Sequence, residues 1–177
     1  MTILISLAIY SFVKIFLVEP HRVKGESMVP NFANGELLLT EKVTYRFYPP
    51  ARGDVIVFKA PGPQNVDFIK RIIGLPGDTV KIADGSVFIN GQKLDEPYEA
   101  QQTQGDENIT LSPNKYFVLG DNRGASSDSR VFGPIDKSSF NGRAWVVYFP
   151  LFKTDKSQGA RVISRVHYSI PDTFNYR

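Results

Sequence analysis

The chain has no cysteine and only two histidines among its 177 residues. Without cysteine it forms no disulfide, offers no thiolate to a metal ion and has no cysteine nucleophile. Long runs of lysine and arginine are absent as well, and the formal net charge is only +3. This composition gives no sign of a nucleic-acid partner. We therefore expect one globular unit with no metal site, no cofactor and no nucleic-acid partner.

Long apolar runs are scarce too, but one lies at the N-terminus. Residues 2–18 read TILISLAIYSFVKIFLV and include a single charge, Lys14. A membrane-spanning helix needs about 20 apolar residues, with a lower limit near 17, and a lysine near one end can reach the interface. Residues 1–18 are therefore interpreted as a transmembrane anchor. A signal peptide fits less well, because no basic region or small-residue cleavage site flanks the run. A buried core helix is the other alternative.

Beyond residue 18 the chain lacks long helical periodicity and is mainly β. Short segments rich in Val, Ile, Phe and Tyr alternate with Gly, Pro, Asn and Asp, which is typical of strands and turns. The predicted strands are 37–42, 54–59, 79–82, 86–89, 115–119, 144–149 and 160–168. Asp84-Gly85 and Asn90-Gly91 flank one of these strands and predict two tight hairpins. The polar segment 96–113 is expected to run over the surface.

A catalytic nucleophile in such a chain has to be an oxygen. A Ser-His-Asp triad would need His21 or His167 as the base, but neither lies in a pattern that indicates it. Ser27 lies in GESMVP, where Gly25 permits close backbone approach and Pro30 ends regular structure. Its hydroxyl is therefore expected on an irregular turn. A plain turn serine is the alternative.

Lys70 lies in the apolar run VDFIKRIIGLPGD. A lysine at its usual pKa of about 10.4 is charged at neutral pH and can accept a proton only if burial lowers that pKa. Strand alternation places Lys70 on the same face as Phe68 and Ile72, and Arg71 on the other face, where a carboxylate could pair with it. A lysine on an edge strand that discourages aggregation is the alternative.

A third segment, GDNRGASSDSR from Gly120, is dense in small polar and ionic residues. Such a loop can satisfy its own side chains through hydrogen bonds and ion pairs, and so form a rigid scaffold for a site. A solvated loop or an anion-binding turn is the alternative.

The chain resembles the bacterial type I signal peptidases, the Ser/Lys-dyad enzymes of family S26. The resemblance is carried by VEPHRVKGESMVPNF, GELLLTEKV, RGDVIVF, DFIKRIIGLPGD and GDNRGASSDSR with FGPI, in the family's order. It implies a β catalytic domain at 19–177, an inserted β subdomain at about 82–113, and an N-terminal transmembrane helix. It also implies a single-pass protein of the bacterial plasma membrane with an extracytoplasmic catalytic domain; a thylakoid enzyme is the alternative location.

The resemblance assigns roles to individual residues. Ser27 would attack the scissile carbonyl, and neutral Lys70 would take its proton and later protonate the leaving amine. Ser126 would orient the lysine. The supporting ionic network would comprise Asp121, Arg123, Asp128 and Arg130, with Arg71 joined to Asp121. Gly25 departs from members that place a serine there as an oxyanion donor, and the loss of such a donor costs about 3 kcal/mol.

The implied substrates are preproteins whose signal peptides carry small residues at positions −1 and −3 before the cut. The residues expected to form the shallow apolar subsites are Val23, Met28, Phe32, Leu38, Phe68 and Ile69. The substrate would add as a strand beside residues 68–70. A lipid bilayer is the other expected partner, with Phe47 and Tyr48 as candidate contacts.

Two other functions remain open at this stage. A self-cleaving repressor-type peptidase shares the Ser-Lys chemistry but has a DNA-binding helix-turn-helix where this chain has an apolar run. A non-catalytic, membrane-tethered β module would leave Ser27 and Lys70 without a role.

Overall fold

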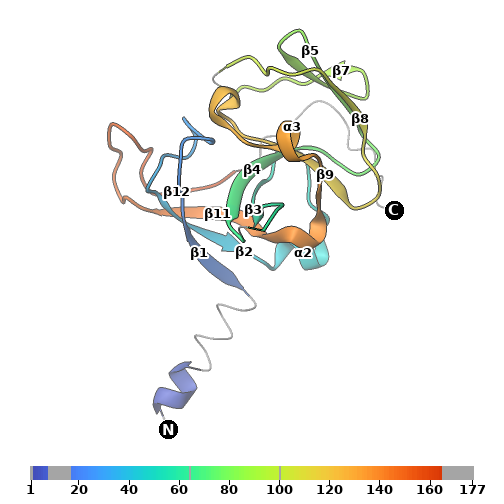
Figure 1. Ribbon diagram of the computed structural model, residues 1–177. Helices are drawn as coiled ribbons and strands as arrows, with labels where there is room; N and C mark the ends of the chain where they lie inside the picture. Colours follow the sequence, from blue (N-terminus) through green and yellow to red (C-terminus); the bar gives the residue numbers. More distant parts are fainter. Residues whose placement is uncertain (1, 8–16, 64, 100, 165–177) are drawn as a thin grey trace.

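The computed structural model describes residues 2–7, 17–63, 65–99 and 101–164. These residues form two antiparallel sheets (Figure 1). The larger sheet has the order β1-β2-β11-β3-β4-β9-β10, and β12 also pairs with β11. Its strands are β1 (Val18–Arg22), β2 (Leu37–Glu41), β3 (Val55–Lys59), β4 (Asp67–Gly74), β9 (Lys115–Leu119), β10 (Ile135–Asp136), β11 (Phe140–Phe149) and β12 (Arg161–Val162). Strands distant in sequence thus lie side by side.

The smaller sheet has the order β7-β6-β5-β8. Its strands are β5 (Thr79–Ala83), β6 (Ser86–Ile89), β7 (Gln92–Lys93) and β8 (Glu107–Thr110). Asp84-Gly85 joins β5 to β6 and Asn90-Gly91 joins β6 to β7, and all four residues have positive φ angles. This conformation is the one that two-residue hairpin turns require. The inner face of the sheet packs on Phe117 and Leu119, which lie on β9 of the larger sheet.

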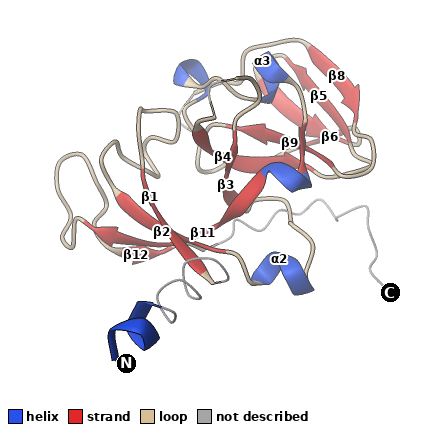
Figure 2. Ribbon diagram, turned by 60° about the horizontal axis from the view of Figure 1, so that its bottom comes forward, coloured by secondary structure: helices blue, strands red, loops and turns tan. Residues whose placement is uncertain are grey.

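Helices are short in the described part of the globular fold (Figure 2). The two α-helices are α2 (Thr44–Phe47) and α3 (Ser129–Phe132), and the 3-10 turns are η1 (Arg123–Ala125) and η2 (Lys137–Ser139). Asp128 caps α3 by accepting a hydrogen bond from the Arg130 amide. The 3-10 turn η1 and the helix α3 lie in the polar loop that begins at Gly120, directly after β9.

The prediction of a mainly β fold is confirmed, and the predicted strands 86–89 and 115–119 match β6 and β9 to the residue. The prediction that segment 96–113 runs over the surface holds for most of its described residues but not for all of them. It contains β8, and its Glu96, Thr103 and Leu111 side chains are buried. The cause is partly electrostatic, because the Glu96 carboxylate pairs with the buried Arg123 guanidinium. The smaller sheet also begins at Thr79, three residues before the expected boundary at 82.

The predicted anchor at 1–18 lies mostly outside the described residues. Residues 2–7 are helical and β1 begins at Val18. No helix within the described ranges is long and apolar enough to cross a bilayer. Of the predicted strand 160–168, residues 161–162 form β12, and residues 165–168 lie outside the described ranges.

Candidate active site

The side chains of Ser27 and Lys70 meet at one end of a cleft between β1 and β4. Lys70 Nζ donates a hydrogen bond to Ser27 Oγ over 2.8 Å and a second one to the Ile69 carbonyl over 2.9 Å. Lys70 is only 3% exposed, and its Nζ lies 5.1 Å from the centre of the Phe68 ring. Ser27 lies on a turn and is partly exposed. A reachable hydroxyl is therefore paired with a buried amine.

Burial changes the protonation of this amine. Desolvation lowers the pKa of Lys70 from 10.5 to about 8, although the carboxylates of Asp128 and Asp121 act in the opposite direction. A neutral amine has a lone pair that can accept the hydroxyl proton, whereas an ammonium has none. The environment of Lys70 thus makes an uncharged form accessible near neutral pH, as a general base requires.

The turn that carries Ser27 is tied to the loop after β9 through Asn122. The Asn122 amide donates to the Ser27 carbonyl over 3.0 Å, and its Nδ2 donates to the Glu26 carbonyl over 3.1 Å. These two bonds fix the backbone on which the Ser27 hydroxyl is mounted. Sequence reasoning did not single out Asn122, because an asparagine between Asp and Arg gives no local sign of a contact 95 residues away.

Behind Lys70, Arg71 forms a bidentate ion pair with Asp121, as the sequence suggested. Its Nε lies 2.8 Å from Asp121 Oδ1 and its Nη2 lies 2.7 Å from Oδ2. Asn31 Nδ2 also donates to Asp121 Oδ2 over 2.9 Å, and the Tyr98 ring stacks 4.1 Å from the guanidinium. The pair is buried, so loss of either partner would leave an uncompensated charge. It joins β4, the segment after Ser27 and the loop at 120.

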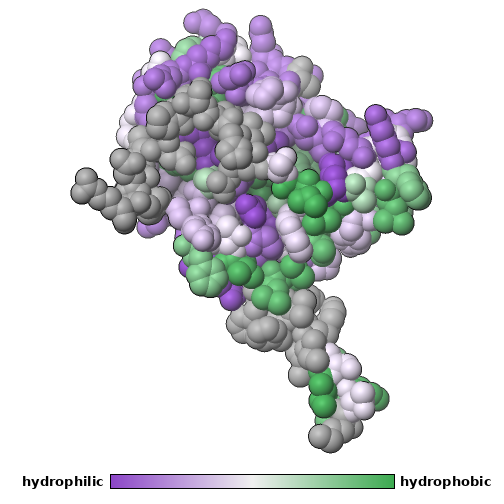
Figure 3. Space-filling model, turned by 180° about the vertical axis from the view of Figure 1, so that it is seen from behind, coloured by the Kyte–Doolittle hydropathy of each residue, from purple (hydrophilic) through white to green (hydrophobic). Residues whose placement is uncertain are grey.

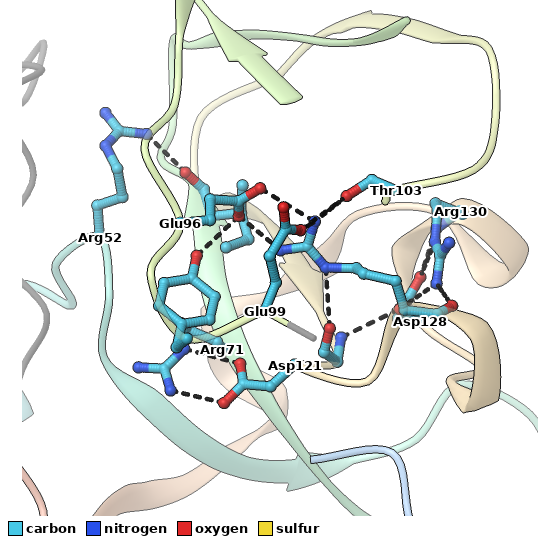
Figure 4. A network of polar contacts seen from close by, with 12 residues as sticks. Arg52, Arg71, Glu96, Glu99, Thr103, Asp121, Asp128 and Arg130 are labelled. Carbon is cyan, nitrogen blue, oxygen red and sulfur yellow. Dashed lines mark hydrogen bonds and ion pairs between the residues drawn. The ribbon is translucent and has the colours of Figure 1, made fainter. Parts of the chain in front are cut away.

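The remaining ionic residues form a second network, shown in Figure 4. Arg123 Nε donates to the Gly120 carbonyl over 3.0 Å, and its guanidinium binds Glu96, Glu99 and Thr103. Asp128 accepts the Gly120 amide over 3.0 Å and pairs with Arg130. Both backbone groups of Gly120 are therefore held by buried charged side chains. Glu96 and Glu99 come from the segment that had been expected on the surface, and no nearby motif marked them.

Ser126 is placed differently from the expectation. Ser126 Oγ is buried and has no hydrogen-bond partner among the described residues, so the expected bond to Lys70 is not formed. The hydroxyl is turned instead against Gly120, where an added Cβ would lie 2.2 Å from it. The Gly25 amide donates to Asn34 Oδ1 over 3.1 Å. This amide is therefore engaged within the protein.

The cleft has a volume of about 560 Å³. Of the six residues expected to form subsites, the cleft is lined by Val23, Leu38, Phe68 and Ile69. Met28 and Phe32 are 1% and 2% exposed and pack in the core cluster beneath Val23 and Ile69. They support the apolar wall from behind, because the turn after Ser27 directs them inward. His21 and Asp67 also line the cleft. Among the described residues, no cluster of three or more His, Asp or Glu side chains could hold a metal ion.

With this geometry established, comparison with known proteins gives a match to the family model described as signal peptidase, peptidase S26, over residues 1–149. The chain belongs to the signal peptidase family S26. It is a hydrolase, a serine endopeptidase of the kind that cleaves signal peptides. Family membership decides against the repressor-type peptidase and the non-catalytic module.

Several known signal peptidases are similar in sequence to this chain over most of its length. A signal peptidase I of Leptolyngbya laminosa is 39% identical over 162 residues, which covers 85% of this chain and 78% of the relative. A probable signal peptidase I-1 of Synechocystis sp. is 36% identical over 84% of this chain and 80% of its own. A signal peptidase I of Bacillus licheniformis is 36% identical over 88% and 89%. A solved signal peptidase I of Enterococcus faecalis has a TM-score of 0.49 and 35% identity, covering 54% of this chain and 97% of its own.

Proposed function

We propose that the protein is a membrane-bound signal peptidase in which Ser27 is the nucleophile and Lys70 the general base. The observation that carries this proposal is the 2.8 Å hydrogen bond between Lys70 Nζ and Ser27 Oγ, formed by a lysine that is 3% exposed. The cleft that opens beside the pair offers room for a peptide. The nucleophile, the base and the proposed substrate channel therefore lie next to one another.

The reaction follows from this geometry. Ser27 Oγ attacks the scissile carbonyl as Lys70 Nζ accepts the hydroxyl proton. The tetrahedral intermediate collapses, the new ammonium of Lys70 protonates the departing amine, and an acyl-enzyme remains on Ser27. Lys70, neutral again, then removes a proton from the water that attacks the ester and passes that proton to Ser27 Oγ as the acyl group leaves, which restores the free enzyme. The loop that contains Gly120, Asn122 and Ser126 is held in position by the ionic residues around it. These positioning residues are Arg71, Asp121, Arg123, Asp128 and Arg130. In this proposal Ser126 orients Lys70 once its hydroxyl rotates away from Gly120.

The substrate is proposed to bind as an extended strand between β1 and β4. Among the described strands, β1 pairs only with β2, and β9 pairs with β4 only from Arg71 onward. The backbone of β4 between Asp67 and Lys70 is therefore open on one side for main-chain hydrogen bonds. Val23 and Ile69 would contact the small residue at −1, close to Ser27. Preproteins with small residues at −1 and −3 are the proposed substrates.

Residues 1–18 are proposed to anchor the enzyme in the bacterial plasma membrane as one span, with residues 19–177 on the extracytoplasmic side and the smaller sheet as an insertion. Exposed apolar side chains support contact with lipid. Trp145, Phe149 and Phe152 are 42%, 53% and 82% exposed, and Phe47 and Tyr48 at the end of α2 are 75% and 68% exposed. Figure 3 shows apolar surface at the end of the fold from which the N-terminal residues extend.

A precursor-processing assay tests the catalytic assignment. The detergent-solubilised full chain is incubated with a precursor that carries an Ala-x-Ala site, and the product is identified by mass spectrometry. Ser27→Ala and Lys70→Ala should each abolish detectable cleavage, because loss of either member of a dyad removes nucleophilic attack. The matched controls are Ser112→Ala and Lys81→Ala, two exposed residues of the smaller sheet region.

Both control variants should process the precursor at the wild-type rate. Cleavage retained by Ser27→Ala would remove Ser27 from the mechanism, and cleavage retained by Lys70→Ala would do the same for Lys70. A loss of activity in the controls as well would point to misfolding, which circular dichroism of each variant separates from a catalytic defect.

A further inference from the structure

The cleft wall that continues from Val23 ends in a polar pair, His21 and Asp67. His21 lies on β1, and its side chain is 12% exposed. Its Nδ1 lies 3.7 Å from Asp67 Oδ2, at the start of β4. Both residues line the cleft, whereas Val23, Leu38, Val57 and Ile69 make the rest of this wall apolar. An imidazole and a carboxylate thus face each other in the cleft, next to these apolar side chains.

The hydrogen bonds around His21 determine which ring nitrogen carries the proton. His21 Nε2 lies 3.1 Å from Thr40 Oγ1, and the Thr40 hydroxyl donates its only proton to the Glu19 carbonyl. We assign the ring proton to Nε2, which then donates to Thr40 and leaves Nδ1 of the neutral ring as an acceptor. Asp67 Oδ1 receives Lys59 and Asn141, but Oδ2 receives no hydrogen bond from the described residues. Nδ1 and Asp67 Oδ2 are thus two acceptors that face each other, and the Asp67 side chain is 31% exposed, so a hydroxyl group can reach them.

The spacing of the strands relates this pair to the cleavage site. Residues two apart on a strand lie on the same face, about 6.6–6.8 Å apart. His21 lies on β1, and Val23 is two residues further along the chain, just past the end of that strand. Asp67 and Ile69 are two apart on β4. The same interval separates the side chains at −1 and −3 of an extended substrate. A residue at −1 beside Val23 and Ile69 therefore has its −3 neighbour beside His21 and Asp67.

We propose that His21, together with Asp67, sets the residue preference at −3 and selects a small side chain that carries a hydroxyl group over an apolar one of equal size. The inference rests on the proposed substrate channel and specifies its second subsite. A serine or threonine hydroxyl at −3 donates to Nδ1 or to Asp67 Oδ2. A valine of the same shape buries both acceptors without a donor, and such unpaired groups cost far more than a missing methyl group.

The preference also depends on pH through the state of the ring. Four charged groups act on His21: Glu19 on its own strand, Asp67 on β4, Lys59 on β3 and Lys42 after β2. Burial, aided by the two lysines, lowers the pKa of His21 below 6.5, although Glu19 and Asp67 raise it. The ring is therefore neutral at pH 8. Below its pKa, Nδ1 carries a proton and forms an ion pair with Asp67, so a substrate hydroxyl finds no vacant acceptor pair.

Competition between two matched precursors tests this inference. Precursors with Thr-x-Ala and Val-x-Ala sites are mixed with the wild-type enzyme, because threonine and valine have the same shape. The ratio of products gives the ratio of kcat/KM values, in which the shared dependence on Lys70 cancels. We expect the ratio to favour threonine by about tenfold at pH 8. His21→Phe should bring the ratio to about one, and His21→Asn, which keeps a polar acceptor, should retain most of the preference.

The wild-type ratio should also fall toward one as the pH is lowered from 8 through the pKa of His21, which lies below 6.5, a measurement that needs no variant to fold. A ratio near one for the wild type at pH 8, or one unchanged by His21→Phe and by pH, overturns the inference. An Ala-x-Ala precursor is included as a reference in every reaction. If that precursor is cut at the expected bond while the threonine preference is missing, only the subsite assignment fails. If it is not cut, or is cut by Ser27→Ala, the proposed function itself fails.

Discussion

Gly120 lies against both the turn that carries Ser27 and the Ser126 side chain. A Cβ added there would lie 2.5 Å from the Ser27 carbonyl oxygen and 2.2 Å from Ser126 Oγ. Its amide and carbonyl are both held by charged side chains, Asp128 and Arg123. The backbone has no freedom to absorb a methyl group, so the turn that carries Ser27 would have to move.

We therefore predict that Gly120→Ala lowers kcat about 100-fold, the usual effect of displacing a reacting group by about 1 Å. The measurement is steady-state cleavage of an Ala-x-Ala precursor. Gly91→Ala is the matched control, because Gly91 has a positive φ and no atom within 4 Å of an added Cβ. Its backbone strain is local to a hairpin of the smaller sheet, so its kcat should equal that of the wild type. Equal kcat values for both variants would show that the contact at Gly120 does not constrain Ser27.

At the scale of elements, β12 supports the nucleophile turn although it lies beyond residues 1–149, the span of the family model. Arg161 forms a bidentate ion pair with Glu36, which is 1% exposed, and donates to the Asn31 carbonyl. Its guanidinium also lies 5.4 Å from the centre of the Phe32 ring. The two-residue strand β12 thus holds the segment that follows Ser27 in place.

Arg161→Ala should lower the free energy of unfolding by about 3 kcal/mol, because it leaves the buried Glu36 carboxylate without its cation. Urea unfolding followed by circular dichroism measures this loss. Adding Glu36→Gln to Arg161→Ala should recover part of the stability, since the uncompensated charge is then removed. The exposed Lys153→Ala serves as the control and should unfold like the wild type. If Arg161→Ala lowers the free energy of unfolding by less than about 0.5 kcal/mol, the ion pair with Glu36 does not stabilise the fold.

The strands differ in how well their own residues specify them. β6 and β9 are bounded by turn or polar residues and, after their first residues Ser86 and Lys115, consist of Val, Ile, Phe, Leu and Tyr, so local preference predicts both to the residue. β1, with the sequence VEPHR, and β8, with ENIT, have no apolar alternation and form because they pair with β2 and β5. Their tertiary partners are not visible in local sequence. The polar loop at 120 was recognisable by its composition, but its contacts with Glu96 and with the turn at Ser27 depend on the fold.

At the scale of the whole molecule, exposed apolar side chains gather on β11 and on the segment that leads to β12. Trp145 is the only tryptophan of the chain and is 42% exposed. Aromatic residues of this kind are enriched at membrane interfaces. Its fluorescence therefore reports on the contact between the catalytic domain and lipid.

In vesicles whose lipids carry bromine on their acyl chains, we expect Trp145 fluorescence to be strongly quenched relative to vesicles of unbrominated lipid. Phe152→Ser should reduce the quenching, because it removes a side chain that is 82% exposed beside the same segment. The exposed Lys81→Ala, in the smaller sheet, should leave it unchanged. Equal fluorescence in both kinds of vesicle would mean that this surface faces water and that the anchor alone holds the protein at the membrane.

The pKa of Lys70 tests the central claim most directly. The full chain, labelled with ¹³C at lysine Cε, is titrated by NMR in detergent, and the Lys70 resonance is assigned by its absence from Lys70→Ala. Deprotonation is expected with a midpoint at about pH 8, since burial disfavours the ammonium, so the neutral fraction and the rate of cleavage rise together through that pH. A Lys70 resonance that titrates near 10.5, the value of an exposed lysine, would contradict the account.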